Sequence, residues 1–296
     1  MESKDTTNNS KKQLKSDNAN NKLRDLKSNF ILKILFGYIP KKLSLELIKY
    51  NKYIKKRMNI NINDYKTYSE IYSSIKIEII PKIDGYFNQF INIKNEDEKY
   101  YHIYFNNNKK DEIKRYYLNE FDKVSKINII IDYQVKSFSE LFMDCNCIES
   151  INFKTFYRNN IINMKSIFCG CSSLKELNFT NFKTDSVIDM SSMFEGCSSL
   201  KELNLSNFNT NNVTNMRFMF YYCSALKELN LTNFNTNKVT NMSYMFFKCL
   251  SLKEINLTNF NTNNVTNMDH MFNGCSDELK LKIQSQYKNF KKKAFD

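Results

Sequence analysis

Cysteine is the most reactive side chain that this sequence repeats at a fixed spacing. Six of the eight cysteines recur at intervals of 26 residues: Cys145, Cys171, Cys197, Cys223, Cys249 and Cys275. If successive units stack as neighbouring strands, these sulfurs lie about 4.8 Å apart, within the reach of a disulfide. A reducing compartment and apolar surroundings favour thiols that pack as small hydrophobic groups. We therefore expect buried free thiols.

Two Cys-x-Cys pairs have the residue type of a metal site but not the usual spacing. They are Cys145 with Cys147, and Cys169 with Cys171. Zinc ligands are usually separated by two to four residues. One member of each pair already belongs to the six cysteines that recur every 26 residues, which we call the ladder cysteines. We expect no metal here.

Residues for catalysis are scarce. The chain has two histidines, His102 and His270, and neither has a nearby partner in the sequence for nucleophilic chemistry. Phosphate-binding glycine loops and Gly-x-Ser-x-Gly are missing from a sequence with five glycines. The sequence therefore predicts no catalytic residue, no cofactor and no enzymatic activity.

Aromatic and basic residues provide the strongest signal for binding. They occupy the variable positions of a repeated Met-x-x-Met-Phe-x-x-Cys segment, which we expect to point away from the core. The candidate partner-binding residues are Arg217, Phe218, Tyr221, Tyr222, Tyr244, Phe247 and Lys248. Aromatic and Arg side chains dominate protein-binding hot spots, so a protein is favoured over a nucleic acid as the partner. The alternative is that the rings pack against neighbouring units.

The element that must position these residues is a 26-residue repeat. Each unit has the form Leu-x-x-Leu-x-Leu-x-x-Phe, then a polar Asn/Thr stretch, then the Met/Cys segment. The first part predicts a short strand with inward leucines, and the apolar spacing of the last part is helical. One unit cannot bury its apolar face alone, so the units are expected to stack.

The repeat resembles the BspA-like class of the leucine-rich-repeat family. The resemblance covers roughly residues 135–276 and is carried by blocks such as Cys-Ser-Ser-Leu-Lys-Glu-Leu-Asn-Leu-Ser-Asn-Phe, which begins at Cys197. It implies an α/β leucine-rich-repeat solenoid with a role in adhesion or protein interaction. Many members are surface proteins, but no export signal is visible here, so we expect a cytoplasmic location.

A second resemblance concerns the N-terminal helices. Residues 30–58 show an apolar stripe at helical spacing that includes Leu43, Leu47, Ile54 and Met58. Together with Ile31-Leu-Lys-Ile-Leu-Phe-Gly-Tyr-Ile-Pro, this looks like an F-box core, although the usual Leu-Pro pair and the later Trp are missing. The resemblance implies a substrate adaptor of a ubiquitin ligase. An ordinary helical cap is the favoured interpretation.

Composition divides the chain into five segments. Residues 1–60 hold 15 Lys and Arg against 5 Asp and Glu, which supplies ten of the thirteen net positive charges. We predict a disordered basic arm over 1–28, a helical segment over 29–65, a β-rich cap over 66–132, the repeats over 133–278 and a basic C-terminal helix or tail over 279–296. Within the cap, Ile75–Pro81, Tyr100–Phe105 and Lys126–Asp132 are expected to be strands.

The strand face of the repeats is too uniform to suggest a unique binding site. Glutamates recur at Glu176, Glu202, Glu228 and Glu254, each preceded by a lysine and followed two residues later by an asparagine. Such a face suits a periodic ligand or none. We predict a monomeric protein-interaction scaffold without a transmembrane segment, and keep the ubiquitin-ligase adaptor and a surface adhesin as alternatives.

Overall fold

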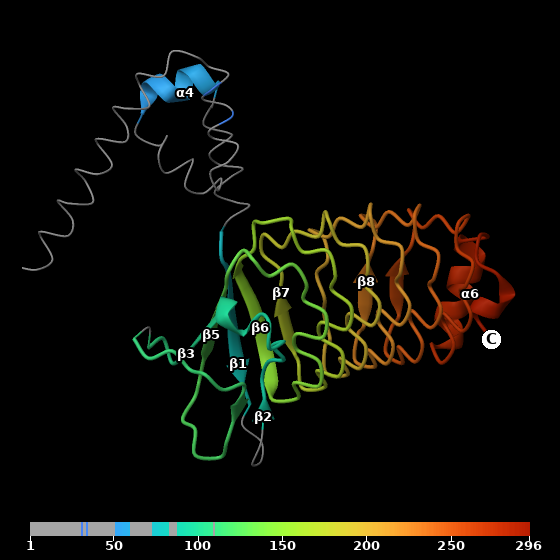
Figure 1. Ribbon diagram of the computed structural model, residues 1–296. Helices are drawn as coiled ribbons and strands as arrows, with labels where there is room; N and C mark the ends of the chain where they lie inside the picture. Colours follow the sequence, from blue (N-terminus) through green and yellow to red (C-terminus); the bar gives the residue numbers. More distant parts are fainter. Residues whose placement is uncertain (1–30, 32–33, 35–50, 60–72, 83–87, 109) are drawn as a thin grey trace, which may run out of the picture. The chain divides into compact units, whose positions relative to one another are not determined.

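The computed structural model describes residues 31, 34, 51–59, 73–82, 88–108 and 110–296 (Figure 1). The chain divides into two compact units, Met1–Tyr72 and Ser73–Asp296. In the described residues, β-strands and turns predominate and helices are few. The predicted α/β class is therefore correct only for its β component.

The described part of the first unit contains helix α4, Lys52–Met58. Asn51 begins it, because its side chain accepts a hydrogen bond from the Ile54 amide at 3.1 Å. Asn59, at φ 53°, ends it in the left-handed region. The predicted helix is confirmed over this stretch. The predicted arm 1–28 and most of the F-box-like segment lie outside the described residues.

The second unit begins with a five-stranded sheet in the order β3-β5-β1-β6-β7. The strands are β1 Ile75–Pro81, β3 Tyr101–Phe105, β5 Ile127–Ile131, β6 Ile148–Thr155 and β7 Glu176–Asn178. The three predicted strands of the β-rich region are thus confirmed within one residue at each end. Since β1 pairs antiparallel with β6 and β6 pairs parallel with β7, this sheet runs into the first repeats.

Short elements complete the β-rich region. Strands β2, Asn88–Gln89, and β4, Tyr117–Leu118, form a separate antiparallel pair. The 3-10 helix η1, Glu98–Tyr100, leads into β3.

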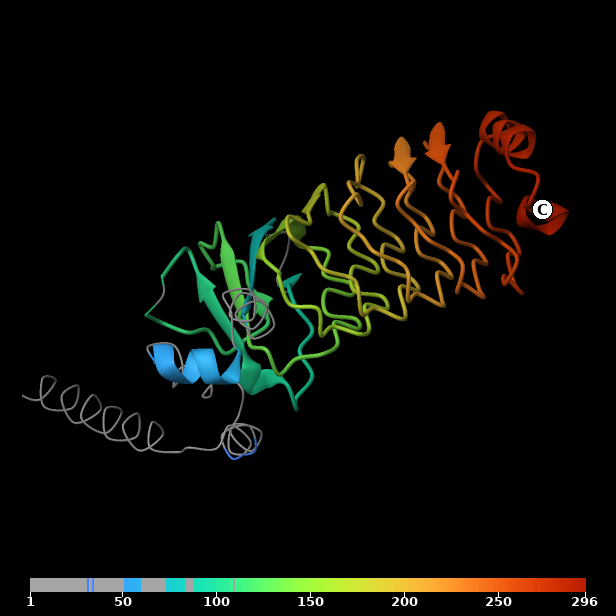
Figure 2. The same ribbon diagram turned by 90° about the horizontal axis from the view of Figure 1, so that it is seen from above.

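The repeats stack with the predicted 26-residue register (Figures 1 and 2). Parallel bridges link Ser137 to Asn163, and then Asp189, Asn215, Asn241 and Asn267 in succession. Strands β8, Glu228–Asn230, and β9, Glu254–Asn256, pair in parallel. The phenylalanine before each ladder cysteine is buried and stacks on its equivalent, with ring centroids 5.5 Å apart for Phe194 and Phe220.

The Met/Cys segment forms turns, so its predicted helical character is wrong. Two kinds of backbone hydrogen bond alternate along it. The Ser192 and Phe194 amides bond to carbonyls of the next unit, whereas the Met193 amide bonds to Met190 three residues back. This arrangement also buries apolar residues at steps of three and four, which explains why the spacing looked helical.

Buried polar groups connect the units. The Thr210 hydroxyl donates to the Asn235 carbonyl at 2.9 Å and accepts from the Asn235 amide at 2.8 Å, and the same pair of bonds recurs at Thr184 and Thr236. We call these bonds the threonine clasp. The ladder thiols also donate between units, as Cys223 does to the Phe194 carbonyl at 3.1 Å.

The C-terminal residues close the stack by imitating another unit. Helix α6, Asp277–Gln286, has Ser276 as its N-cap and is shorter than the predicted basic helix. The 3-10 helix η2, Lys292–Ala294, then provides carbonyls to the amides of the last repeat, including Phe272. The Phe295 ring stacks on Phe272 at 5.3 Å and continues the phenylalanine column.

Candidate interaction surface

Five aromatic rings from two neighbouring repeats pack together on the side of the stack that the Met/Cys turn segments form. We call Phe218, Tyr221, Tyr222, Tyr244 and Phe247 the aromatic patch. Tyr221 stacks on Phe247 at 5.0 Å with an angle of 11°, and Phe218 lies 5.1 Å from Tyr244. Tyr221 also contacts Phe218 at 5.1 Å and Tyr222 at 4.6 Å. The ladder register therefore brings together the rings that the sequence predicted.

Both predicted cations lie against these rings. The Arg217 guanidinium is 4.3 Å from the centroid of Phe218. The Lys248 ammonium is 4.9 Å from the Tyr222 ring and donates a 2.7 Å hydrogen bond to its hydroxyl. All seven predicted residues thus form one cluster, and its binding function stays a prediction.

The patch is distinct from the core beneath it. Phe220 and Phe246 of the same units are completely buried, whereas Tyr222 is 37% exposed and the other four rings are half-buried. The rings thus contact one another but keep surface in contact with solvent. The rings of one unit do pack against those of the next, as the alternative expected, so binding of a partner by their exposed surface stays a prediction.

The structure corrects two expectations about the variable positions. Ser191 and Ser243 are buried, so not every variable position points outward. His270 extends the patch, with its ring 5.0 Å from Tyr244. Its place 26 residues after Tyr244 was a usable signal in the sequence, but the small and polar neighbours of His270 hid it.

The backbone beneath the patch adopts an unusual conformation. Two positions in each turn segment have positive φ, and the patch fills them with large side chains: Phe218 (58°), Tyr222 (57°), Tyr244 (58°) and Lys248 (53°). The positions equivalent to Tyr222 and Lys248 hold Gly170, Gly196 and Gly274 in other units. Large residues are uncommon in this region because the Cβ atom crowds the backbone.

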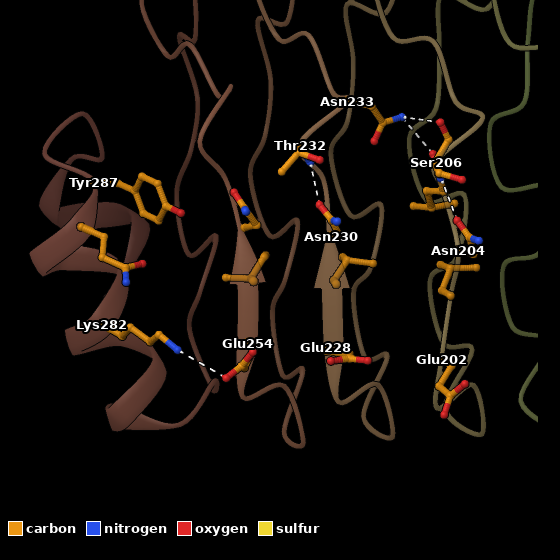
Figure 3. A pocket seen from close by; sticks show the side chains of 16 residues that line it. Glu202, Asn204, Ser206, Glu228, Asn230, Thr232, Asn233, Glu254, Lys282 and Tyr287 are labelled. Atoms are coloured by element: carbon orange, nitrogen blue, oxygen red, sulfur yellow. Dashed lines mark hydrogen bonds and ion pairs between the residues drawn. The ribbon is translucent and has the colours of Figure 1, made fainter.

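A groove on the strand face is the second candidate surface (Figure 3). It has a volume of about 790 Å³, and its residues include Glu228, Asn230 and Tyr287. At its end, Lys282 of α6 lies 3.7 Å from Glu254. Each strand contributes the same glutamate and asparagine, so the structure confirms the uniform character that the sequence indicated.

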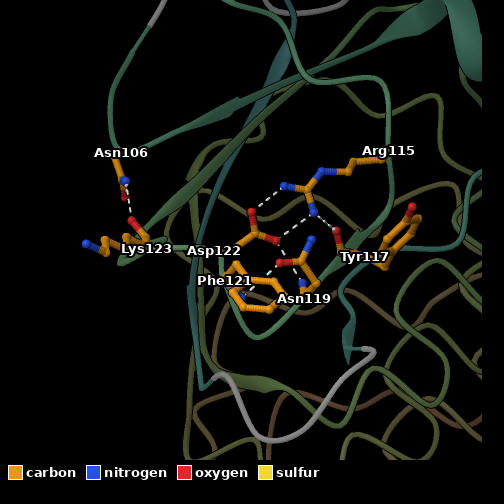
Figure 4. A network of polar contacts seen from close by, with 7 residues as sticks. All are labelled: Asn106, Arg115, Tyr117, Asn119, Phe121, Asp122 and Lys123. Atoms are coloured by element: carbon orange, nitrogen blue, oxygen red, sulfur yellow. Dashed lines mark hydrogen bonds and ion pairs between the residues drawn. The ribbon is translucent and has the colours of Figure 1, made fainter.

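Phe121 is a third exposed feature, and the sequence analysis missed it (Figure 4). Its ring is 83% exposed on a turn in which the Asn119 side chain accepts from the Phe121 amide at 3.0 Å. Asp122 holds the turn by accepting from Arg115 at 2.7 Å. This ion pair keeps the Asp122 pKa below its usual value. No repeat register or motif marks this turn in the sequence.

The ladder cysteines and the two histidines have close contacts elsewhere in the second unit. The ladder thiols are buried, and this burial raises the pKa of Cys275 to about 11. His102 contacts the Glu112 carboxylate at 3.0 Å, and His270 Nδ1 lies 2.6 Å from the Asp296 carbonyl. Over the described ranges, no group of three His, Cys, Asp or Glu residues could hold a metal ion.

Curated proteins and solved structures show little similarity to this chain. No curated protein matches it. One solved structure, a leucine-rich-repeat protein of T. pallidum, is 16% identical, with a TM-score of 0.32 over 51% of this chain and 75% of that chain. None of these findings supports the F-box-like resemblance. In the part of the chain that the structure describes, no helix has the length and apolar character needed to cross a membrane.

A protein-family model matches the repeat region directly. Its two matches, residues 136–230 and 222–293, together span more than half of the chain. They overlap at residues 222–230 and together cover the stretch in which the six cysteines recur every 26 residues. The chain therefore belongs to the family described as "Mycoplasma protein of unknown function, DUF285".

Proposed function

We propose that this chain is a non-enzymatic protein-interaction module whose repeats, arranged as a leucine-rich-repeat-like solenoid, present the aromatic patch to a partner. The observation that carries the proposal is the cluster of large side chains at left-handed backbone positions. A left-handed conformation costs a non-glycine residue about 1–2 kcal/mol. Tyr222 and Lys248 accept this cost where three equivalent positions hold glycine.

Such positions indicate function when folding alone would favour a smaller residue. Glycine satisfies the same backbone geometry in other units, so the stack does not need Tyr222 or Lys248 in order to form. Backbone strain of this kind is common where a binding surface requires a particular side chain. Exposed rings beside Arg217 provide the residue types of a protein hot spot.

The test separates binding from folding. Tyr222→Gly and Lys248→Gly each remove a patch side chain and relieve the backbone strain. We expect the free energy of unfolding to change by no more than about 1 kcal/mol, because strain relief offsets the lost contacts and the greater freedom of glycine when unfolded. Capture of partners from an extract of the source cells should fall sharply.

The matched control is Asp144→Gly, which changes the equivalent position, at φ 57°, in another unit. It should leave partner capture unchanged. Unaltered capture by the Tyr222→Gly and Lys248→Gly proteins would refute the proposal. A stability loss well above 2 kcal/mol would instead assign the side chains to the core.

No observation favours the ubiquitin-ligase adaptor or the surface adhesin over this function. We propose a cytoplasmic location and a monomer, as the sequence predicted. The eight cysteines, all with free thiols, would then stay reduced.

A further inference from the structure

The charges within the aromatic patch indicate what kind of partner it would bind. Arg217 lies over Phe218, and Lys248 lies over Tyr222 and Phe247, so two cations accompany the rings. Neither cation has a carboxylate within 4.0 Å among the described residues. Other lysines of the repeats do have a carboxylate within that distance, such as Lys175, which lies 2.8 Å from Glu149.

The carboxylates near the patch do not cancel these charges. Asp269, in the last repeat, is paired with Lys293 at 2.7 Å. Glu195 lies near Tyr221, where burial, the Tyr222 phenol and the Glu195 charge together raise the Tyr221 pKa. With Asp269 paired to Lys293, the two cations Arg217 and Lys248 outnumber the single carboxylate of Glu195, so the patch keeps a net positive charge.

Hydrogen bonding adds to this preference. Lys248 Nζ donates to the Tyr222 oxygen at 2.7 Å, so the hydroxyl hydrogen must point elsewhere and can donate to a partner. The exposed Arg217 guanidinium can donate as well. The patch therefore offers apolar rings bordered by donors and cations.

We propose that the aromatic patch binds an acidic segment of a partner protein. An apolar side chain of that segment packs on the rings, and its carboxylates meet Arg217 and Lys248. The proposal rests on the proposed function, because it names the chemistry of the partner at the same surface.

A single-stranded nucleic acid is also anionic, but it needs open ring faces on which its bases can stack. Here the faces are partly covered by other side chains: the Tyr221 ring stacks on the Phe247 ring with an angle of 11°, and the Arg217 guanidinium lies over the Phe218 ring. Side chains that pack against ring edges suit this geometry better than bases do. The observations therefore favour a protein segment.

The experiment selects a random-peptide display library on the immobilised full chain, with the Tyr222→Gly protein as counter-selection. Enriched peptides should combine aromatic or aliphatic residues with Asp or Glu and carry a net negative charge. Arg217→Gln and Lys248→Gln should each weaken their binding about 3-fold and reduce its dependence on salt. Lys227→Gln, which removes an exposed lysine of the strand face, should have no effect.

Neutral or basic enriched peptides, or no enrichment at all, would overturn the acidic-partner proposal. So would displacement of the peptides by an unstructured oligonucleotide at a comparable concentration. If Tyr222→Gly abolishes capture of cellular partners but the two glutamine variants do not weaken it, the proposed function stands and only the acidic preference fails. If Tyr222→Gly leaves that capture intact, the proposed function itself fails.

Discussion

Thr210→Val tests whether the threonine clasp stabilises the stack. The Thr210 side chain is 1% exposed, and its hydroxyl bonds to both the carbonyl and the amide of Asn235 in the next unit. Valine has nearly the same shape, so the substitution leaves no large cavity. It removes both hydrogen bonds and leaves two backbone groups without partners.

The expected cost follows from those two groups. A buried donor or acceptor that loses its partner costs about 1–3 kcal/mol. Asn235 is half-buried, so water can partly replace the lost bonds. For the two groups together this cost would be about 2–6 kcal/mol, and we expect the free energy of unfolding to fall by about 2 kcal/mol, at the lower end of that range.

The assay is urea unfolding of the full chain, together with hydrogen exchange of the Asn235 amide. The control is Thr240→Val, since the Thr240 side chain is exposed and donates only to the Thr214 carbonyl, at 3.2 Å. The control should change stability by less than about 0.5 kcal/mol. A Thr210→Val protein as stable as the control, with Asn235 exchange unchanged, would refute the reasoning.

Two further predictions concern the thiols and the C-terminal closure. Burial raises the pKa of Cys147 and Cys275 from the ordinary 9.0 to about 11. The stabilising contribution of these two thiols is therefore complete below pH 9 and is lost as the pH rises through about 11. Urea unfolding at several pH values checks this, and a constant free energy of unfolding between pH 9 and 11 would contradict it. Phe295→Ala removes the ring stacked on Phe272 at 5.3 Å and should cost about 2 kcal/mol of unfolding free energy, whereas Phe121→Ala, at a ring 83% exposed, should cost less than about 0.5 kcal/mol. Equal stabilities of the two alanine variants would show that the tail does not close the stack.

The repeat register and much of the candidate surface followed from the sequence. A 26-residue period fixes which residues become neighbours once units stack, so Tyr221 and Phe247 could be placed together from spacing alone. Alternating isoleucines likewise predicted β1, because every second side chain of a strand faces the core.

The turn segment could not be predicted in this way. Apolar steps of three and four fit a helix as well as a series of turns, and what separates them is the positive φ at positions such as Ser192. The tail was also hidden, because it imitates a repeat through backbone carbonyls and the Phe295 ring, which lies outside the 26-residue register. Phe121 lies on a turn beside a local ion pair, Arg115 with Asp122, and no periodicity in the sequence reveals this turn.

Hydroxyl-radical footprinting of the full chain, with and without a peptide selected on it, tests the central claim most directly. The aromatic patch and the strand-face groove each contain an oxidisable tyrosine, Tyr222 and Tyr287 respectively. Binding through the patch predicts that oxidation of Tyr222 and Phe247 falls while that of Tyr287 is unchanged. Protection of Tyr287 with no change at Tyr222 would place the partner in the groove and contradict the account.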